Sequence, residues 1–129
     1  MIGSILDSLR YSKHRNTGRR GEDLAHRFLK KRGYTVVARN FRLSSGDAEA
    51  DIIAWDGETL AIVEVKSRET ANYGPPERAI GDEKRRHMLR VARAYARKIN
   101  LDWSRVRFDV VTVIFHPQSI ELHRDAIPK

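Results

Sequence analysis

The segment from residue 46 to residue 66 constrains the fold more than any other part of the chain, because it reads as two strands joined by a tight turn. Its sequence is GDAEADIIAWDGETLAIVEVK, in which Asp56-Gly57 is a dipeptide typical of a β-hairpin turn. The strand expected over 59–66 is apolar on both faces, which is typical of a strand in the middle of a covered sheet. The segment therefore predicts a hairpin buried inside a layered α/β domain.

Helices and further strands are predicted on both sides of this hairpin. Apolar residues recur at helical spacing over 18–32 and again from residue 77 or 82 to residue 99, where the predicted buried face is Met88, Val91, Ala92, Tyr95 and Ile99. Strands are expected over 34–40, 50–55, 59–66, 106–115 and 119–123, with a loop over 67–76. The core order is α-β-β-β-α-β, which predicts a three-layer α/β fold with a mixed central sheet.

The length and composition favour one basic domain. The chain has 129 residues, no cysteine, 25 Lys and Arg against 17 Asp and Glu, and a formal net charge of +8. We expect a single domain over 17–129, and residues 1–16 are interpreted as an amphipathic or flexible N-terminal extension. Without a run of about 18 apolar residues, no membrane association is expected. The charge favours a nucleic-acid partner, and we expect a cytoplasmic protein.

Two carboxylates and one ammonium group are predicted to meet at one end of the hairpin. Asp51 lies near the start of the first strand, and Glu64 and Lys66 lie on one face at the end of the second. Two buried carboxylates repel unless a cation lies between them. That cation is either a divalent ion, for which carboxylate oxygens suit Mg²⁺ or Mn²⁺, or Lys66 itself in an internal salt bridge.

Further charged residues are candidates for the same site. Glu22, at the edge of the apolar stripe of the first helix, either reaches the same ion as a third carboxylate or only complements the helix dipole. Glu49 has the same strand parity as Asp51 and is an additional acidic candidate. Lys84 is predicted to point toward the sheet, whereas Arg86, Arg90, Arg93 and Arg97 form a row interpreted as a solvated helix face. The residues expected to contact phosphate are Arg19, Arg20, Arg68, Lys84 and Arg85.

No other pattern in the sequence competes with this site. The five histidines show no metal-binding spacing, and the sequence has no phosphate-binding glycine loop and no nucleophile-elbow or dinucleotide motif.

A set of motifs in order along the chain resembles the YraN-like family of uncharacterised bacterial proteins. The motifs are GRRGEDLA at 18–25, RGYTVVARNFR at 32–42, AEADIIA at 48–54, VEVKSR at 63–68, YGPP at 73–76 and VRFDVV at 106–111. That family is similar to the PD-(D/E)xK nuclease superfamily and to Holliday-junction resolvases. The resemblance implies a restriction-endonuclease-like core and a metal site of Glu22, Asp51 and Glu64, with Lys66 as the catalytic lysine. One departure is Ala48-Glu49-Ala50-Asp51, where the family has Gly-Glu before its Ile-Asp.

Three functions remain open from the sequence. The first is a metal-dependent nuclease that hydrolyses phosphodiester bonds in DNA, with branched or damaged DNA as the expected substrate. The second is a catalytically inactive nucleic-acid-binding module that keeps the nuclease fold. The third is an interaction protein that docks through residues 1–16. A homodimer would suit symmetric cutting of two strands, although no motif requires one.

Overall fold

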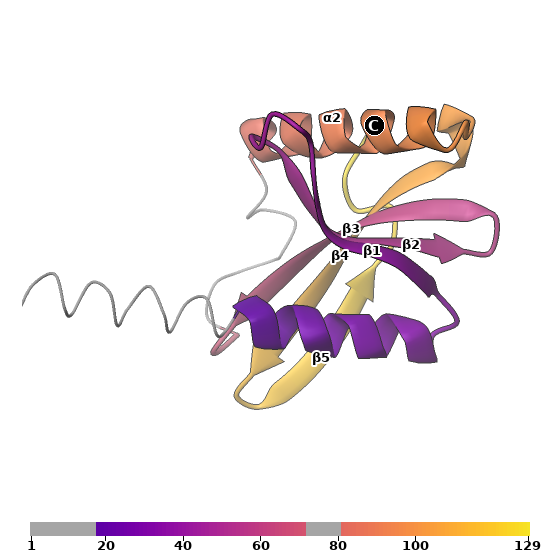
Figure 1. Cartoon of the computed structure of the whole chain (residues 1–129). Helices are drawn as coiled ribbons and strands as arrows, with labels where there is room; N and C mark the ends of the chain where they lie inside the picture. Colours follow the sequence, from indigo (N-terminus) through magenta and orange to yellow (C-terminus); the bar gives the residue numbers. More distant parts are fainter. Residues whose placement is uncertain (1–17, 72–80) are drawn as a thin grey trace, which may run out of the picture.

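The computed structural model describes residues 18–71 and 81–129 (Figure 1). The interpretation of residues 1–16, and the YGPP motif at 73–76, lie outside the described residues. A five-stranded sheet forms the centre, in the order β1-β2-β3-β4-β5. Its strands are β1 (Thr35–Arg42), β2 (Glu49–Asp56), β3 (Thr59–Arg68), β4 (Val106–Phe115) and β5 (Gln118–His123).

The sheet is mixed, as the sequence predicts. β1, β2 and β3 are antiparallel neighbours, β3 and β4 are parallel, and β5 returns antiparallel to β4. The parallel pair requires a crossover connection, which contains helix α2 (Asp82–Lys98). Gly57 turns the β2–β3 hairpin with a φ of +61°, a left-handed conformation that glycine adopts without strain.

Two helices cover opposite faces of the sheet, which gives three layers (Figure 1). Residues 18–31 are helical and bury Ala25 and Leu29 against one face. On the other face, α2 buries Met88 and Val91 against a separate apolar cluster that includes Phe108. The predicted α-β-β-β-α-β order is thus confirmed, and β3 is buried from both sides.

The buried face of α2 differs from the predicted one at its C-terminal end. The helix begins at Asp82, the later of the two predicted starts, and ends at Lys98. Ile99 caps the helix and is 38% exposed, so its predicted burial is wrong. Ala96 is buried, and Tyr95 packs half-buried at the edge of the cluster. Because the helix ends at Lys98, Ile99 does not continue its buried face.

β3 is two residues longer than predicted, because its partner strand continues beside it. Ser67 and Arg68 pair in parallel with Val113 and Ile114 of β4. The loop therefore begins after Arg68 rather than at residue 67. Among the described residues, no helix has both the length and the apolar character needed to cross a membrane.

Candidate active site

Asp51 lies where β2 and β3 stop pairing, and its side chain takes the place of a backbone hydrogen-bond acceptor for β3. The last paired residues of β2 and β3 are Ile52 and Val63, so the next position would place Asp51 opposite Glu64. Instead, Asp51 Oδ2 accepts a hydrogen bond of 2.8 Å from the backbone N–H of Val65. The side chain is buried, with the residue 8% exposed. This bond fixes the carboxylate beside the end of β3.

Glu64 lies between two lysines that come from different elements. Lys66 Nζ, two residues later on β3, is 3.6 Å from Glu64 Oε1. Lys84 Nζ, in the first turn of α2, is 3.4 Å from Glu64 Oε2, which agrees with its predicted direction toward the sheet. Glu64 Oε2 is nevertheless a buried oxygen without a hydrogen-bond partner. The carboxylate is therefore compensated by charge and still lacks one directed contact.

Burial opposes the charge on both carboxylates. Burial, and then the neighbouring charge of Asp51, raise the pKa of Glu64 to about 7, against the opposing effect of Lys84 and Lys66. Burial also raises the pKa of Asp51, while the Val65 N–H and Lys84 act in the opposite direction. Two adjacent carboxyl groups in one buried space favour a shared proton or a bound cation.

Glu22 lies beside this pair and is held by its own partners. Arg39 NH2 is 3.6 Å from Glu22 Oε2 and 2.8 Å from Asp23 Oδ1, and the Asn40 side chain is hydrogen-bonded to Glu22. Burial, and then the charge of Asp51, raise the pKa of Glu22. Within residues 18–71 and 81–129, however, no three Asp, Glu or His side chains come close enough together to hold one metal ion. Glu22 is thus a neighbour of the Asp51–Glu64 pair and does not complete a three-carboxylate cluster.

Helix 18–31 approaches β3 through a glycine one residue before Glu22. A Cβ atom on Gly21 would lie 1.6 Å from Ser67 Oγ and 2.8 Å from Ser67 Cβ, far inside normal contact distance. Only the absence of a side chain lets the helix backbone pack this closely on the end of β3. Gly21 therefore determines how near Glu22 lies to Asp51.

The remaining acidic candidate, Glu49, is turned toward a basic partner. Glu49 Oε2 accepts a 2.7 Å hydrogen bond from Arg42 Nε across the β1–β2 pair. Its charge contributes to the raised pKa values of Asp51 and Glu22. Glu49 is thus an electrostatic neighbour of the site with an ion pair of its own.

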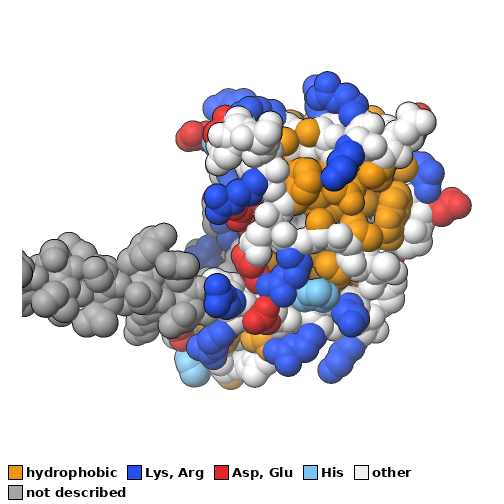
Figure 2. All heavy atoms as spheres, viewed as in Figure 1, with side chains coloured by type: hydrophobic (Ala, Val, Ile, Leu, Met, Phe, Trp, Pro, Cys, Tyr) orange, Lys and Arg blue, Asp and Glu red, His pale blue; other side chains and the backbone are white. Residues whose placement is uncertain are grey.

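The five residues expected to contact phosphate occupy different settings. Arg19 and Arg20 are exposed on helix 18–31, and the Arg20 guanidinium lies 4.5 Å from the centre of the Phe115 ring. Arg68 ends β3 and is half-buried. Arg85 donates to the Pro128 carbonyl at 2.9 Å. Lys84 belongs to the carboxylate site. Figure 2 shows that Lys and Arg side chains are spread widely over the face drawn there.

The comparison with known proteins gives a family. The model of the uncharacterised protein family UPF0102 matches residues 21–113. The chain belongs to this family. It is 51% identical over 118 residues to a UPF0102 protein of Solibacter usitatus, a match that covers 88% of this chain and 89% of that protein. A UPF0102 protein of Koribacter versatilis is 46% identical (88% and 78% covered), and one of Desulfosudis oleivorans is 50% identical (84% and 87% covered).

The part of the chain that matches the UPF0102 family includes the whole carboxylate site. It begins at Gly21 and extends past the end of α2 into β4. Glu22, Asp51, Glu64, Lys66 and Lys84 all lie within it. Membership of UPF0102 confirms the resemblance to YraN-like proteins that the sequence motifs predicted.

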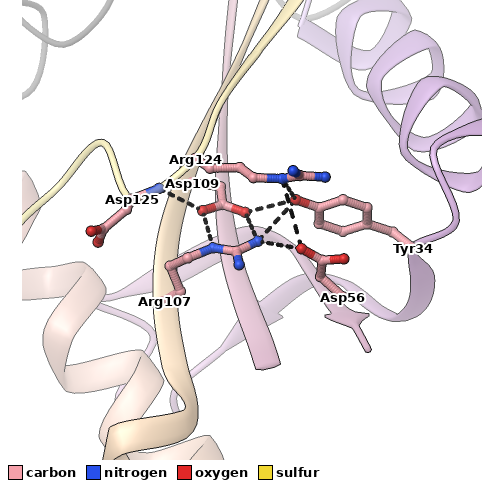
Figure 3. Close-up of polar contacts among 6 residues, drawn as sticks. All are labelled: Tyr34, Asp56, Arg107, Asp109, Arg124 and Asp125. Atoms are coloured by element: carbon pink, nitrogen blue, oxygen red, sulfur yellow. Dashed lines mark hydrogen bonds and ion pairs between the residues drawn. The ribbon is translucent and has the colours of Figure 1, made fainter. Parts of the chain in front are cut away.

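A second polar cluster of this UPF0102 protein was not predicted from the sequence (Figure 3). Asp109, on β4, is 0% exposed and accepts hydrogen bonds from Arg107 Nε (2.8 Å), the Asp125 N–H (2.9 Å) and Tyr34 Oη (3.1 Å). Arg107 also donates to Asp56 at 2.9 Å. These contacts join β4 to the hairpin turn, to the start of β1 and to the C-terminal segment. Since both Asp109 oxygens are bonded, the cluster is an anchor of the fold.

Arg39 and Asn40 are the residues near the site that sequence reasoning missed. Both lie in a predicted strand and in the RGYTVVARNFR motif and were given no role at the site, yet they hold Glu22. Asn40 has a φ of +51°, an uncommon conformation for a residue other than glycine. The asparagine within the predicted strand was the available signal, because asparagine tolerates this conformation better than most residues.

Proposed function

We propose that this chain is a metal-dependent nuclease that hydrolyses phosphodiester bonds in DNA, with branched or damaged DNA as its substrate. The observation that carries the proposal is the buried Asp51–Glu64 pair flanked by Lys66 and Lys84. The order of the motifs and the α-β-β-β-α-β core support it further, through their resemblance to PD-(D/E)xK nucleases.

The carboxylate pair fits a divalent cation. Glu64 Oε2 is buried without a hydrogen bond, and burial raises the pKa values of both Glu64 and Asp51 despite the two lysines, so a bound divalent cation would stabilise both anions. Mg²⁺ keeps several waters and usually needs only one or two protein carboxylates beside substrate phosphates. Asp51 and Glu64 would therefore hold the ion, and Glu22 would adjust the local charge from the helix side.

The chain's own residues supply the rest of the chemistry. When bound, the ion lowers the pKa of a water molecule and stabilises developing negative charge. Lys66 and Lys84 keep partly exposed ammonium groups, with side chains 26% and 36% exposed, so they can donate hydrogen bonds to a water and to phosphoryl oxygens. In the reaction, the water oxygen bonds to phosphorus while the bond to the leaving sugar oxygen breaks. The leaving oxygen gains a proton, and the net change is the addition of one water molecule.

The direct test is cleavage of DNA by the purified chain. Supercoiled, linear and four-way-junction DNA are incubated with Mg²⁺ or Mn²⁺, with the wild type and the Glu64→Ala variant side by side. Cleavage by the wild type should fall by at least about 100-fold in Glu64→Ala, as is typical when a group that stabilises the transition state is removed. Absence of cleavage on every substrate, or equal cleavage by both proteins, would sink the proposal.

The alternative is a nucleic-acid-binding module without turnover. One observation favours it, because Lys66 and Lys84 both already pair with Glu64 and could neutralise it without a metal. The two functions differ in thermal unfolding. A metal site predicts that Mg²⁺ or Mn²⁺ raises the Tm of the wild type but not that of Glu64→Ala, since a ligand stabilises only the state that binds it. The binding module predicts no metal effect, and salt-sensitive DNA binding that chelators leave unchanged.

A further inference from the structure

A pocket of about 370 Å³ lies at the C-terminal end of α2, away from the carboxylate site. Ala96, Leu101 and Trp103 give it an apolar and aromatic surface, and Arg93 and Arg97 line it as well. Its volume is at the lower end of the range of roughly 300–1,000 Å³ found for small-molecule sites. The pocket thus combines an aromatic ring with positive charge.

The charges around Trp103 are predominantly positive. The Arg93 guanidinium carbon is 5.3 Å from the centre of the Trp103 ring, and Lys129 Nζ is 5.5 Å from it. Lys129 also donates to the Trp103 carbonyl at 3.0 Å. The neighbouring carboxylate, Asp102, is occupied by the Ser104 N–H (2.9 Å) and hydroxyl (2.6 Å). An incoming anion therefore meets cations, while the nearby acid is already satisfied.

Two of the four arginines in the row on α2 line the pocket, and two do not. Arg86, Arg90, Arg93 and Arg97 are all exposed, as predicted for this face. Arg90 forms an ion pair of 3.0 Å with Asp47. Only Arg93 and Arg97 line the pocket. The row is therefore more than a uniform solvated face.

The pocket and the carboxylate site can be reached by one nucleic-acid strand. Lys84 and Arg97 lie near opposite ends of α2. At 1.5 Å per residue this separation is about 20 Å, or about six nucleotides of one B-form strand.

We propose that this pocket binds the base of an unpaired nucleotide against Trp103, with the attached phosphate held by Arg97 and Arg93. Aromatic side chains beside cations are the usual means of holding unpaired bases without sequence preference. The inference rests on the proposed function for the identity of the ligand. It makes that function more specific, because the substrate must contain single-stranded nucleotides, as junctions and damaged duplexes do.

The test compares two charge reversals on one helix face. Binding of a fluorescein-labelled twelve-nucleotide oligothymidylate, and of a duplex of equal length, is measured by anisotropy without divalent metal for the wild type, Arg97→Glu and Arg86→Glu. Arg86→Glu is the matched control, since it changes the net charge equally outside the pocket. Arg97→Glu should weaken single-strand binding about tenfold beyond the loss in Arg86→Glu, and duplex binding no more than that control. Equal losses on both ligands in both variants would overturn the pocket.

Tryptophan fluorescence separates this proposal from the nuclease proposal. In a Trp55→Phe background, Trp103 is the remaining tryptophan. Unlabelled oligothymidylate should quench it, Arg97→Glu should remove the quenching, and Glu64→Ala should leave it intact. Quenching without any DNA cleavage supports the pocket while the nuclease fails. Cleavage without quenching overturns the pocket while the nuclease proposal stands. Quenching by an acidic hexaglutamate peptide but not by the oligonucleotide also overturns the pocket.

Discussion

Glu64 is the residue at which burial and charge conflict most strongly. It is 4% exposed, next to Asp51, and paired at 3.4 Å and 3.6 Å with two lysines. An ordinary internal ion pair would hold the pKa of a glutamate low. Here the pKa is raised to about 7, so burial and the second carboxylate outweigh both lysines.

The free energy of unfolding should fall as the pH rises from about 4.5 to about 7. Because the folded pKa of Glu64 (about 7) exceeds the ordinary value of 4.5, the folded state binds the proton more tightly than the unfolded state. The stabilisation is fully present below pH 4.5 and is lost between about pH 4.5 and 7, by an amount on the order of 3 kcal/mol. Glu64→Gln removes this titration. Urea unfolding of both proteins at pH 5 and pH 8, without divalent metal, should show the variant gaining stability relative to the wild type at the higher pH.

The matched control for this measurement is Glu49→Gln. Glu49 lies two residues from Asp51 but forms an ion pair with Arg42, with its side chain 30% exposed. Its variant should keep the fall in stability that comes from Glu64, because burial and Asp51, rather than Glu49, raise the pKa of Glu64. If Glu64→Gln follows the wild type across the whole range, Glu64 is ionised at neutral pH, and the pair does not favour a shared proton or a bound cation.

At the scale of elements, the site depends on how closely helix 18–31 packs on the end of β3. Gly21 is buried, and among the glycines of the described residues it is the one at which an added Cβ atom would meet another residue, Ser67, within 4 Å. Gly→Ala in a helix normally stabilises by up to about 1 kcal/mol, whereas overpacking costs about 1–3 kcal/mol. The two effects have opposite signs at Gly21, so their sum depends on the side chain at residue 67.

We expect Gly21→Ala to destabilise the wild type by about 1 kcal/mol and to stabilise a Ser67→Gly variant by a similar amount. The reversal follows because Ser67→Gly removes both atoms that a Cβ at residue 21 would meet, at 1.6 Å and 2.8 Å. Urea unfolding of the two single variants and the double variant measures this coupling. Gly18→Ala is the control, since a Cβ there meets nothing within 4 Å. Additive effects of the two substitutions would show that the helix is free to shift.

The elements of the fold were predictable because their signals are local. The Asp56-Gly57 turn, the apolar β3 strand and the stripe of α2 each lie within a short window, and all three appear in the structure. The end of the pairing between β2 and β3 was harder to predict from the sequence. The hydrogen bond from the Val65 N–H to Asp51 forms because the two strands stop pairing after Ile52 and Val63, and a sequence pattern does not specify that point.

Contacts between distant segments could not be predicted for a similar reason. Tyr34 and Asp109 are 75 residues apart and meet only after β1, β4 and the C-terminal segment are assembled. Glu22 and Arg39 likewise meet across a helix and a strand. The closeness of Asp51 and Glu64 could thus be predicted from strand parity, whereas the place of Glu22 and the partners that hold it depend on tertiary packing.

At the scale of the whole molecule, a net charge of +8 predicts salt-dependent DNA binding, and the spread of Lys and Arg over the surface (Figure 2) leaves the position of bound DNA to be tested. Arg19 and Arg20 are near the site end of helix 18–31, one turn from Glu22. Lys30 and Lys31 are exposed at its other end, about 16 Å away, beyond the Debye length of about 8 Å at physiological salt.

Replacing Arg19 and Arg20 together with Gln should lower the slope of log K against log salt concentration by about 2, because each phosphate contact contributes roughly 0.9. The pair Lys30→Gln and Lys31→Gln changes the net charge equally and should leave the slope nearly unchanged. Anisotropy titrations of labelled DNA from 50 to 200 mM salt, at roughly physiological ionic strengths, measure both slopes. Since the Arg20 guanidinium also packs on Phe115 at 4.5 Å, unfolding curves must first show that the arginine variant remains folded. Equal loss of slope in the two pairs would mean that DNA responds to the total charge of the molecule, and the phosphate backbone would then have no fixed position beside the carboxylate site.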